Sequence, residues 1–201
     1  MEFIANIADL EAHYGTPGQA SLIKVARRMT PSYRAWIARS RLCILSTVSL
    51  EGTDASPRGD DGPVIREIDP GTLALPDWKG NERIDSLRNI VRDARVSLLF
   101  MVAGADNVVR VNGKAQVTAD ADLCDSFARG GKAPRTVILI RIEEIYSQCA
   151  RAFLRARIWR DGDQSAGLPT IGDMLAEMSQ GAIDGAAYDA EWPGRAAETL
   201  W

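Results

Sequence analysis

Five arginines stand at points of this sequence where an anionic ligand could be bound: Arg58, Arg83, Arg110, Arg155 and Arg157. Arginine donates paired, charge-assisted hydrogen bonds to phosphate and carboxylate groups, and its side chain stays charged at physiological pH. Trp159 follows the last two of these arginines in the segment FLRARIW. Together these side chains indicate a site for a phosphate or a similar anion.

Residues 80–90, GNERIDSLRNI, begin as a polar loop and continue as a predicted helix. The first N–H groups of a helix have no partner within it and lie at the positive end of its dipole, so they suit an anion. The alternative is that Asn81 caps the helix and that Arg83 pairs with a surface carboxylate. The spacing alone favours this alternative and leaves the first interpretation open.

Each of the other arginines also has a purely structural interpretation. Arg110 could pair with an acidic residue on a neighbouring strand. Arg155 and Arg157 share one face only if their segment is extended, because on a helix they would diverge. Trp159 is more typical of packing than of a stacking platform for a ligand.

Few residues are present for other catalytic chemistries. With a single histidine, His13, no Ser-His-Asp or Cys-His set is available. The three cysteines are widely spaced and form no C-x-x-C motif, so we expect neither a disulfide framework nor a zinc site. The carboxylates of Asp54, Asp60 and Asp61 are more typical of solvated turns than of a metal site, and we predict no metal. The sequence contains neither a P-loop nor a G-x-G-x-x-G motif after a strand.

The composition is typical of a soluble globular protein. The 201 residues are 46% hydrophobic and 25% charged, which predicts one ordinary domain. A net charge of −3 argues against a general nucleic-acid-binding protein, since such proteins usually carry a basic excess. The N-terminus lacks the basic start and apolar core of a signal peptide, and no apolar run approaches the length of a membrane span. We therefore expect a cytoplasmic protein that binds neither nucleic acid nor membrane.

The pattern of predicted elements indicates a mostly β protein with peripheral helices. The first forty residues read as helices, and apolar, β-branched runs after them predict clustered strands. A helix over residues 81–93 interrupts these strands. Since no regular β-α-β alternation is visible, we expect an antiparallel sheet or barrel of the α+β class. Residues 1–160 would form this domain, and residues 161–201 would add a linker, a short helix and a tail.

Several motifs occur in a fixed order: TVSLEGTDASPRGD, TLALPDWKGNERIDSLRNI, VSLLFMV, VRVNGKAQVT and CARAFLRARIW. Over residues 15–160 this set resembles the pyridoxamine 5′-phosphate oxidase-like FMN-binding family. It is more closely similar to an uncharacterised subfamily with the motifs A-S-P-R-G-D, N-x-R-x-D-S-L-x-N-I and R-x-N-G. The resemblance implies a split β-barrel, and a homodimer with two FMN sites at the subunit interface.

The resemblance also assigns cofactor-binding residues. The residues expected around the flavin phosphate or isoalloxazine are Arg58, Asn81, Arg83, Ser86 and Asn89. The R-x-N-G motif contributes Arg110 and Asn112, and the C-terminal segment, which often reaches the flavin in this family, contributes Arg155, Arg157 and Trp159. Where many relatives carry a lysine, this chain has Arg151, which keeps the charge but not its point-charge geometry.

The function implied by the resemblance is that of an FMN-dependent oxidoreductase acting on an unidentified small molecule, with NADH or NADPH as a candidate electron donor. We do not find the substrate motifs of true pyridoxamine-phosphate oxidases, so we do not expect that specific activity. Two alternatives stay open. The same barrel could carry flavin, deazaflavin or haem without catalysis, or it could be a structural dimer without a cofactor.

Overall fold

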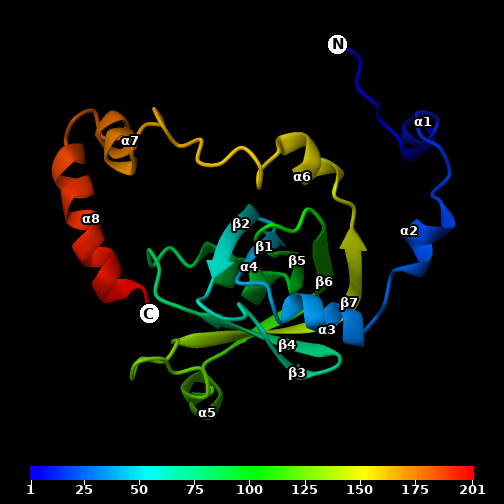
Figure 1. Cartoon of the computed structure of the whole chain (residues 1–201), viewed down its shortest axis with the longest axis horizontal. Helices are drawn as coiled ribbons and strands as arrows, with labels where there is room; N and C mark the ends of the chain where they lie inside the picture. The colour runs from blue at the N-terminus through cyan, green and yellow to red at the C-terminus, as the bar shows by residue number, and fades with distance from the viewer.

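A computed structural model describes residues 1–201 and contains one seven-stranded sheet with helices around it (Figure 1). The strands are β1 (Leu42–Ser49), β2 (Gly52–Gly59), β3 (Arg66–Asp69), β4 (Thr72–Asp77), β5 (Arg95–Met101), β6 (Val108–Thr118) and β7 (Thr136–Gln148). The helices are α1 (Ile7–Glu11), α2 (Gln19–Ile23), α3 (Pro31–Ile37), α4 (Asp85–Arg92), α5 (Ala121–Asp125), α6 (Arg151–Ala156), α7 (Ile171–Met178) and α8 (Gly185–Thr199).

The sheet is antiparallel throughout, with the strand order β2-β1-β5-β6-β7-β4-β3. This confirms the predicted α+β class. The two edge strands, β2 and β3, do not pair, so the sheet is not closed. Arg58 of β2 nevertheless contacts Asp77 of β4, although four strands separate β2 from β4 in the sheet. The sheet therefore curls into an open, split barrel.

The interior of the barrel is filled by side chains that alternate along the strands. In β1 and β5 every second residue is buried, and Leu45, Leu98 and Phe100 have no exposed surface. Alternation with a period of two places one face of each strand on the core. Burial of each such large side chain contributes about 1.5–3 kcal/mol to folding.

The glycine of the R-x-N-G motif has a structural role. Strands β6 and β7 shift register between Asn112 and Gly113, which marks a bulge. A Cβ atom at Gly113 would collide with the backbone carbonyl of Arg141 on β7. Only glycine therefore allows the two strands to approach this closely.

Helix α4 begins later than the sequence predicted. Its first residue is Asp85, and the residue before it, Ile84, is the N-cap in the left-handed region at φ 54°. The Oδ1 atom of Asn81 accepts a hydrogen bond from the N–H of Arg83 (3.1 Å), so it closes a turn ahead of the helix. The prediction that Asn81 caps the helix is wrong, because this local turn uses its side chain instead.

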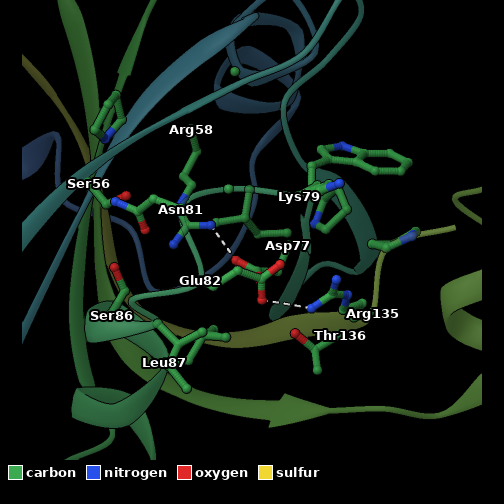
Figure 2. Close-up of a pocket in the computed structure, with 18 of the residues that line it drawn as sticks. Ser56, Arg58, Asp77, Lys79, Asn81, Glu82, Ser86, Leu87, Arg135 and Thr136 are labelled. Carbon is green, nitrogen blue, oxygen red and sulfur yellow. Dashed lines mark hydrogen bonds and ion pairs between the residues drawn. The ribbon is translucent and has the colours of Figure 1, made fainter. Parts of the chain in front are cut away.

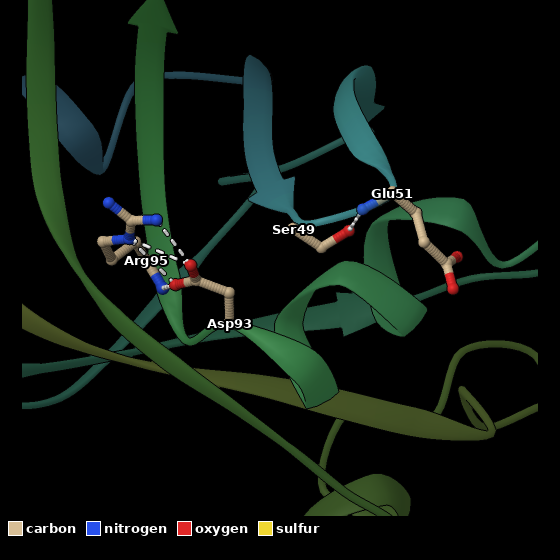
Figure 3. A network of polar contacts seen from close by, with 4 residues as sticks. All are labelled: Ser49, Glu51, Asp93 and Arg95. Atoms are coloured by element: carbon tan, nitrogen blue, oxygen red, sulfur yellow. Dashed lines mark hydrogen bonds and ion pairs between the residues drawn. The ribbon is translucent and has the colours of Figure 1, made fainter.

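Polar contacts hold the other end of α4 and the turn between β1 and β2 (Figure 3). The Asp93 carboxylate accepts hydrogen bonds from the backbone N–H of Arg95 (3.0 Å) and from its guanidinium (2.6 Å). In the β1–β2 turn, the Oγ of Ser49 accepts a hydrogen bond from the N–H of Glu51 (3.1 Å). The Glu51 carboxylate pairs with Arg92 of α4 (2.7 Å), which ties this turn to the helix.

Two helical arms lie on opposite sides of the barrel (Figure 1). Helices α1 and α2 have five residues each and bury none of them. On the other side, a capping box of Thr170 and Asp173 begins α7, and α8 follows. The sequence predicted a tail after α7, but residues Gly185–Thr199 form a helix. No helix in the chain combines the length and the apolar character that crossing a membrane requires.

Candidate functional site

A cavity of about 930 Å³ opens at the split of the barrel (Figure 2). Its walls are formed by β2, the end of β4 with the loop that follows it, the first turn of α4, and the segments 132–136 and 200–201. Sites for small molecules typically measure about 300–1,000 Å³. The cavity is therefore large enough for a ligand of the size of a cofactor.

Two contacts hold the walls of the cavity together. Arg58 contacts Asp77 across the split, and the side chain of each is only 18% exposed. In the first turn of α4, the hydroxyl of Ser86 donates a hydrogen bond to the carboxylate of Asp54 on β2. Because both contacts are partly removed from water, they fix β2 relative to β4 and α4 more firmly than exposed pairs would.

The first turn of α4 brings unpaired N–H groups to the cavity. The N-cap residue, Ile84, has no capping side chain, and the N–H groups of Asp85, Ser86 and Leu87 have no acceptor in the chain. All four residues line the cavity. An unsatisfied helix N-terminus carries a partial charge of about +0.5, so this wall of the cavity suits a phosphate.

Positively charged side chains surround this end of α4. Arg83 pairs with Asp85 (2.8 Å), and Arg135 pairs with Glu82 (2.8 Å; Figure 2). The hydrogen bond to Asp85 raises the pKa of Arg83, which keeps its charge. The ion pair with a surface carboxylate that was one interpretation of Arg83 is therefore present. Arg83 nevertheless also lines the cavity. Lys79 lines the cavity as well and forms no ion pair with any carboxylate of the chain.

Four of the predicted cofactor-binding residues line the cavity, namely Arg58, Asn81, Arg83 and Ser86. Asn89 is not among the cavity residues. It is buried on α4, one turn further along, where its Nδ2 donates a hydrogen bond to the Oγ1 of Thr47 on β1 (3.1 Å). Its side chain thus holds α4 against the barrel.

Arg110 and Asn112 lie on β6 and do not line the cavity. The guanidinium of Arg110 donates a hydrogen bond to the hydroxyl of Tyr146 (3.2 Å) and lies 5.7 Å from the centre of that ring. Its partner on the neighbouring strand is therefore a tyrosine and not an acidic residue. The side-chain amide of Asn112 donates to Glu144 (3.2 Å) and accepts from the hydroxyl of Ser97 (2.8 Å).

Arg155, Arg157 and Trp159 lie in and after α6, and they also lie outside the cavity of their own chain. The segment is helical up to Ala156, so the two arginines do not share one extended face. Arg157 pairs with Asp161 (2.7 Å). The Nε1 of Trp159 donates a hydrogen bond to a backbone carbonyl in the loop between β5 and β6 (2.9 Å).

Sequence reasoning missed several residues that line the cavity, among them Asp54, Asp77, Lys79, Arg135, Thr136 and Trp201. Two buried polar atoms at this wall, the Nε of Arg58 and the Oγ1 of Thr136, have no hydrogen-bond partner. Such an orphaned group costs about 1–3 kcal/mol, and a bound ligand would give it a partner. Asp54, Asp77 and Lys79 lie within the quoted motifs and could have been suspected, whereas Arg135, Thr136 and Trp201 lie outside them.

The region that forms the sheet has a family assignment. Residues 29–149 match the family described as Pyridoxamine 5′-phosphate oxidase. The chain belongs to the pyridoxamine 5′-phosphate oxidase family. The family region contains all seven strands, helix α4 and every cavity residue except Leu200 and Trp201. No curated protein matches the chain.

Several solved structures are similar to about three fifths of this chain. HupZ of Group A Streptococcus is 19% identical, with a TM-score of 0.48, over 59% of this chain and 93% of that chain. A candidate pyridoxamine 5′-phosphate oxidase of Lactobacillus delbrueckii is 24% identical, with a TM-score of 0.48, over 60% and 95%. An FMN-binding protein of Syntrophomonas wolfei is 13% identical, with a TM-score of 0.43, over 58% and 88%.

Proposed function

We propose that this protein binds FMN in the cavity and works as a flavin-dependent oxidoreductase on a small molecule. The observation that carries the proposal is the unpaired N-terminus of α4, which lines the cavity together with Arg58, Lys79 and Arg83. In a member of the pyridoxamine 5′-phosphate oxidase family, an anion site of this kind suits the phosphate of a flavin nucleotide.

The residues present fit such a cofactor. The N–H groups of α4 with Lys79 and Arg83 would hold the phosphate by charge-assisted hydrogen bonds. The Nε of Arg58 and the Oγ1 of Thr136, both orphaned in the protein alone, would gain partners from polar atoms of the ligand. Apolar side chains such as Leu75 give the remaining wall a surface against which a ring could pack.

FMN would supply the redox chemistry when it is bound. The protein's own residues would bind the phosphate, orient the cofactor and limit the access of water. No histidine lines the cavity, and the carboxylates there already accept hydrogen bonds from neighbouring side chains. A site without a free general base is consistent with a reaction carried by the cofactor.

We also infer that two copies of the chain associate. Arg155, Arg157 and Trp159 lie outside the cavity of their own chain, so a role at the flavin requires the cavity of a second copy. The N-terminal arm exposes large apolar side chains, with Phe3 80% and Ile23 76% exposed, and a second copy would cover such a surface. Light scattering at micromolar concentration should give about twice the chain mass of 21.9 kDa. A stable monomer with full flavin affinity would contradict this inference.

The absorption spectrum of the purified protein tests the nature of the cofactor. We expect a flavin spectrum, and we expect mass spectrometry to identify FMN among the molecules released on denaturation. Haem or deazaflavin in its place would contradict the FMN assignment. Steady oxidation of NADH or NADPH in the presence of oxygen would support the enzymatic role. A protein that holds FMN without turnover with any donor would leave it as a carrier.

A further inference from the structure

Helices α7 and α8 form an arm that meets the barrel only at its far end (Figure 1). The two helices touch closely, because a Cβ atom at Gly172 or Gly185 would collide with the backbone carbonyl of the other residue. Every hydrogen bond, ion pair and aromatic contact between the arm and the barrel is made by residues 198–201. An element held by one linker and one end can move as a unit.

The end of the arm is seated in a socket on the barrel, which we define as Trp78, Arg129 and Lys132. The ring of Trp201 lies edge-on to the ring of Trp78, with 5.1 Å between the ring centres. The guanidinium of Arg129 lies 5.3 Å from the centre of the Trp201 ring. The Nζ of Lys132 donates a hydrogen bond to the backbone carbonyl of Glu198 (2.8 Å).

The socket is organised by barrel residues and does not depend on the arm. The carboxylate of Asp60 forms an ion pair with Arg129 (2.8 Å) and accepts a hydrogen bond from the Nε1 of Trp78 (3.3 Å). Arg129 also pairs with Asp61 (2.6 Å). The side chain of Asp60 is only 3% exposed, so the interpretation of this residue as part of a solvated turn is wrong. Instead it positions two of the three socket residues.

The docked arm forms part of the cavity, because Leu200, Trp201 and the socket residues Trp78 and Lys132 all line it. We propose that the α7–α8 arm is a lid over the cavity, which closes when Trp201 enters the socket and opens to admit or release the ligand. The lid itself does not depend on the identity of the ligand. Only the flavin measurement below rests on the proposed function.

Access to the cavity can be measured without flavin. Ser56 is half-buried and lines the cavity, so Ser56→Cys in a Cys149→Ser background places a thiol there. The remaining cysteines are buried, and burial raises the pKa of Cys43 to about 12, so both react slowly at neutral pH. We expect Trp201→Ala to speed labelling by 4,4′-dithiodipyridine about fivefold or more, because the population of the open state rises.

Two further variants control this measurement. Trp192→Ala removes a tryptophan of α8 that is 55% exposed and does not line the cavity, and it should leave the labelling rate unchanged. Lys132→Met removes the hydrogen bond to Glu198 but leaves Trp201 in place, and it should raise the rate about twofold or more. This variant keeps the test decisive if Trp201→Ala fails to fold. Equal labelling rates in Lys132→Met and the parent protein, or in Trp201→Ala and the parent protein, would overturn the lid.

Flavin kinetics provide the second readout. In Trp201→Ala, FMN association and dissociation should both accelerate about fivefold, while the equilibrium affinity changes little, because a lid opposes passage in both directions. Faster dissociation alone would make Trp201 a binding contact and would overturn the lid. If the wild-type protein binds no FMN but the labelling rates change as expected, the proposed cofactor is wrong and the lid stands.

Discussion

Two regions that the family resemblance linked to the cofactor, the cavity and the segment of β6 and α6, differ in the hydrogen-bond donors that they leave unpaired. At the cavity, the first N–H groups of α4 and the Nε of Arg58 have no partner in the chain, and Lys79 has no ion pair. On β6 and after α6, Arg110, Asn112 and Trp159 all bond to neighbouring residues. Oriented donors that remain unpaired have capacity left for a ligand, whereas paired donors already stabilise the fold.

This comparison shows that residue type alone does not identify a binding residue. Arg58 and Arg110 both belong to strands and look alike in the sequence. They differ because the curled sheet brings Arg58 to the split of the barrel, while Arg110 meets a tyrosine on the adjacent strand. Substitutions in the two groups should therefore separate flavin binding from folding stability.

The largest effect is expected for Arg58→Ala, since Arg58 belongs to both the barrel and the cavity. The variant leaves Asp77 half-buried without its partner, so the free energy of unfolding should fall by about 1–3 kcal/mol. Loss of a charged donor at the cavity should also weaken FMN by about tenfold to a hundredfold. Urea denaturation and flavin fluorescence titration measure the two effects. Arg34→Ala, which removes an ion pair with Glu67 away from the cavity, is the control for binding and should leave FMN affinity unchanged.

Arg83→Ala should affect binding without affecting folding. FMN affinity should fall about tenfold, because one charge-assisted contact to the phosphate is lost, while riboflavin affinity hardly changes. Since the Arg83 side chain is 73% exposed, the melting temperature should stay the same. Arg95→Ala is the matched control, because Arg95 also forms an exposed pair with an aspartate two residues away and lies outside the cavity. A lower melting temperature with unchanged FMN affinity would show that Arg83 is structural.

Asn89→Ala should show the opposite behaviour. The change removes the buried hydrogen bond to Thr47, so the free energy of unfolding should fall by about 1–2 kcal/mol. FMN affinity should stay within about threefold of wild type, because a residue outside the cavity acts only through the position of α4. Thermal unfolding measures the change in stability, and flavin titration measures the FMN affinity. A large loss of FMN affinity at unchanged stability would place Asn89 with the binding residues.

The smallest effect on stability is expected for Asp93→Asn, because Asp93 belongs to neither of the two regions compared above. Hydrogen bonds from Arg95 lower the pKa of Asp93 from 3.8 to about 2. A carboxyl group with a lowered pKa stabilises the fold above its ordinary pKa, and this contribution is lost as the pH falls towards 2. The stability difference between wild type and Asp93→Asn should therefore be constant near neutral pH and vanish in acid. Denaturation at a series of pH values checks this, and a difference that persists below pH 2 would contradict it.

Sequence reasoning could predict the barrel but only part of the cavity. The strands were predictable because the alternation of buried and exposed residues can be read from consecutive residues of one strand, such as β1 (Leu42–Ser49). Arg58 and Arg83 were predictable because they stand in recognisable motifs. Arg135 and Trp201 were not, because only the curl of the sheet and the docking of the arm bring them to the cavity. The start of α4 was predicted too early because Asn81 bonds locally within its own turn.

Titration of the wild-type protein, freed of any bound cofactor, with FMN and with riboflavin tests the central claim most directly. The two ligands share the ring and the sugar chain, and they differ only in the phosphate that we assign to the N-terminus of α4 with Lys79 and Arg83. The account predicts that FMN binds about tenfold more tightly or better, with the difference shrinking as the salt concentration rises. Equal affinities for the two flavins would contradict it.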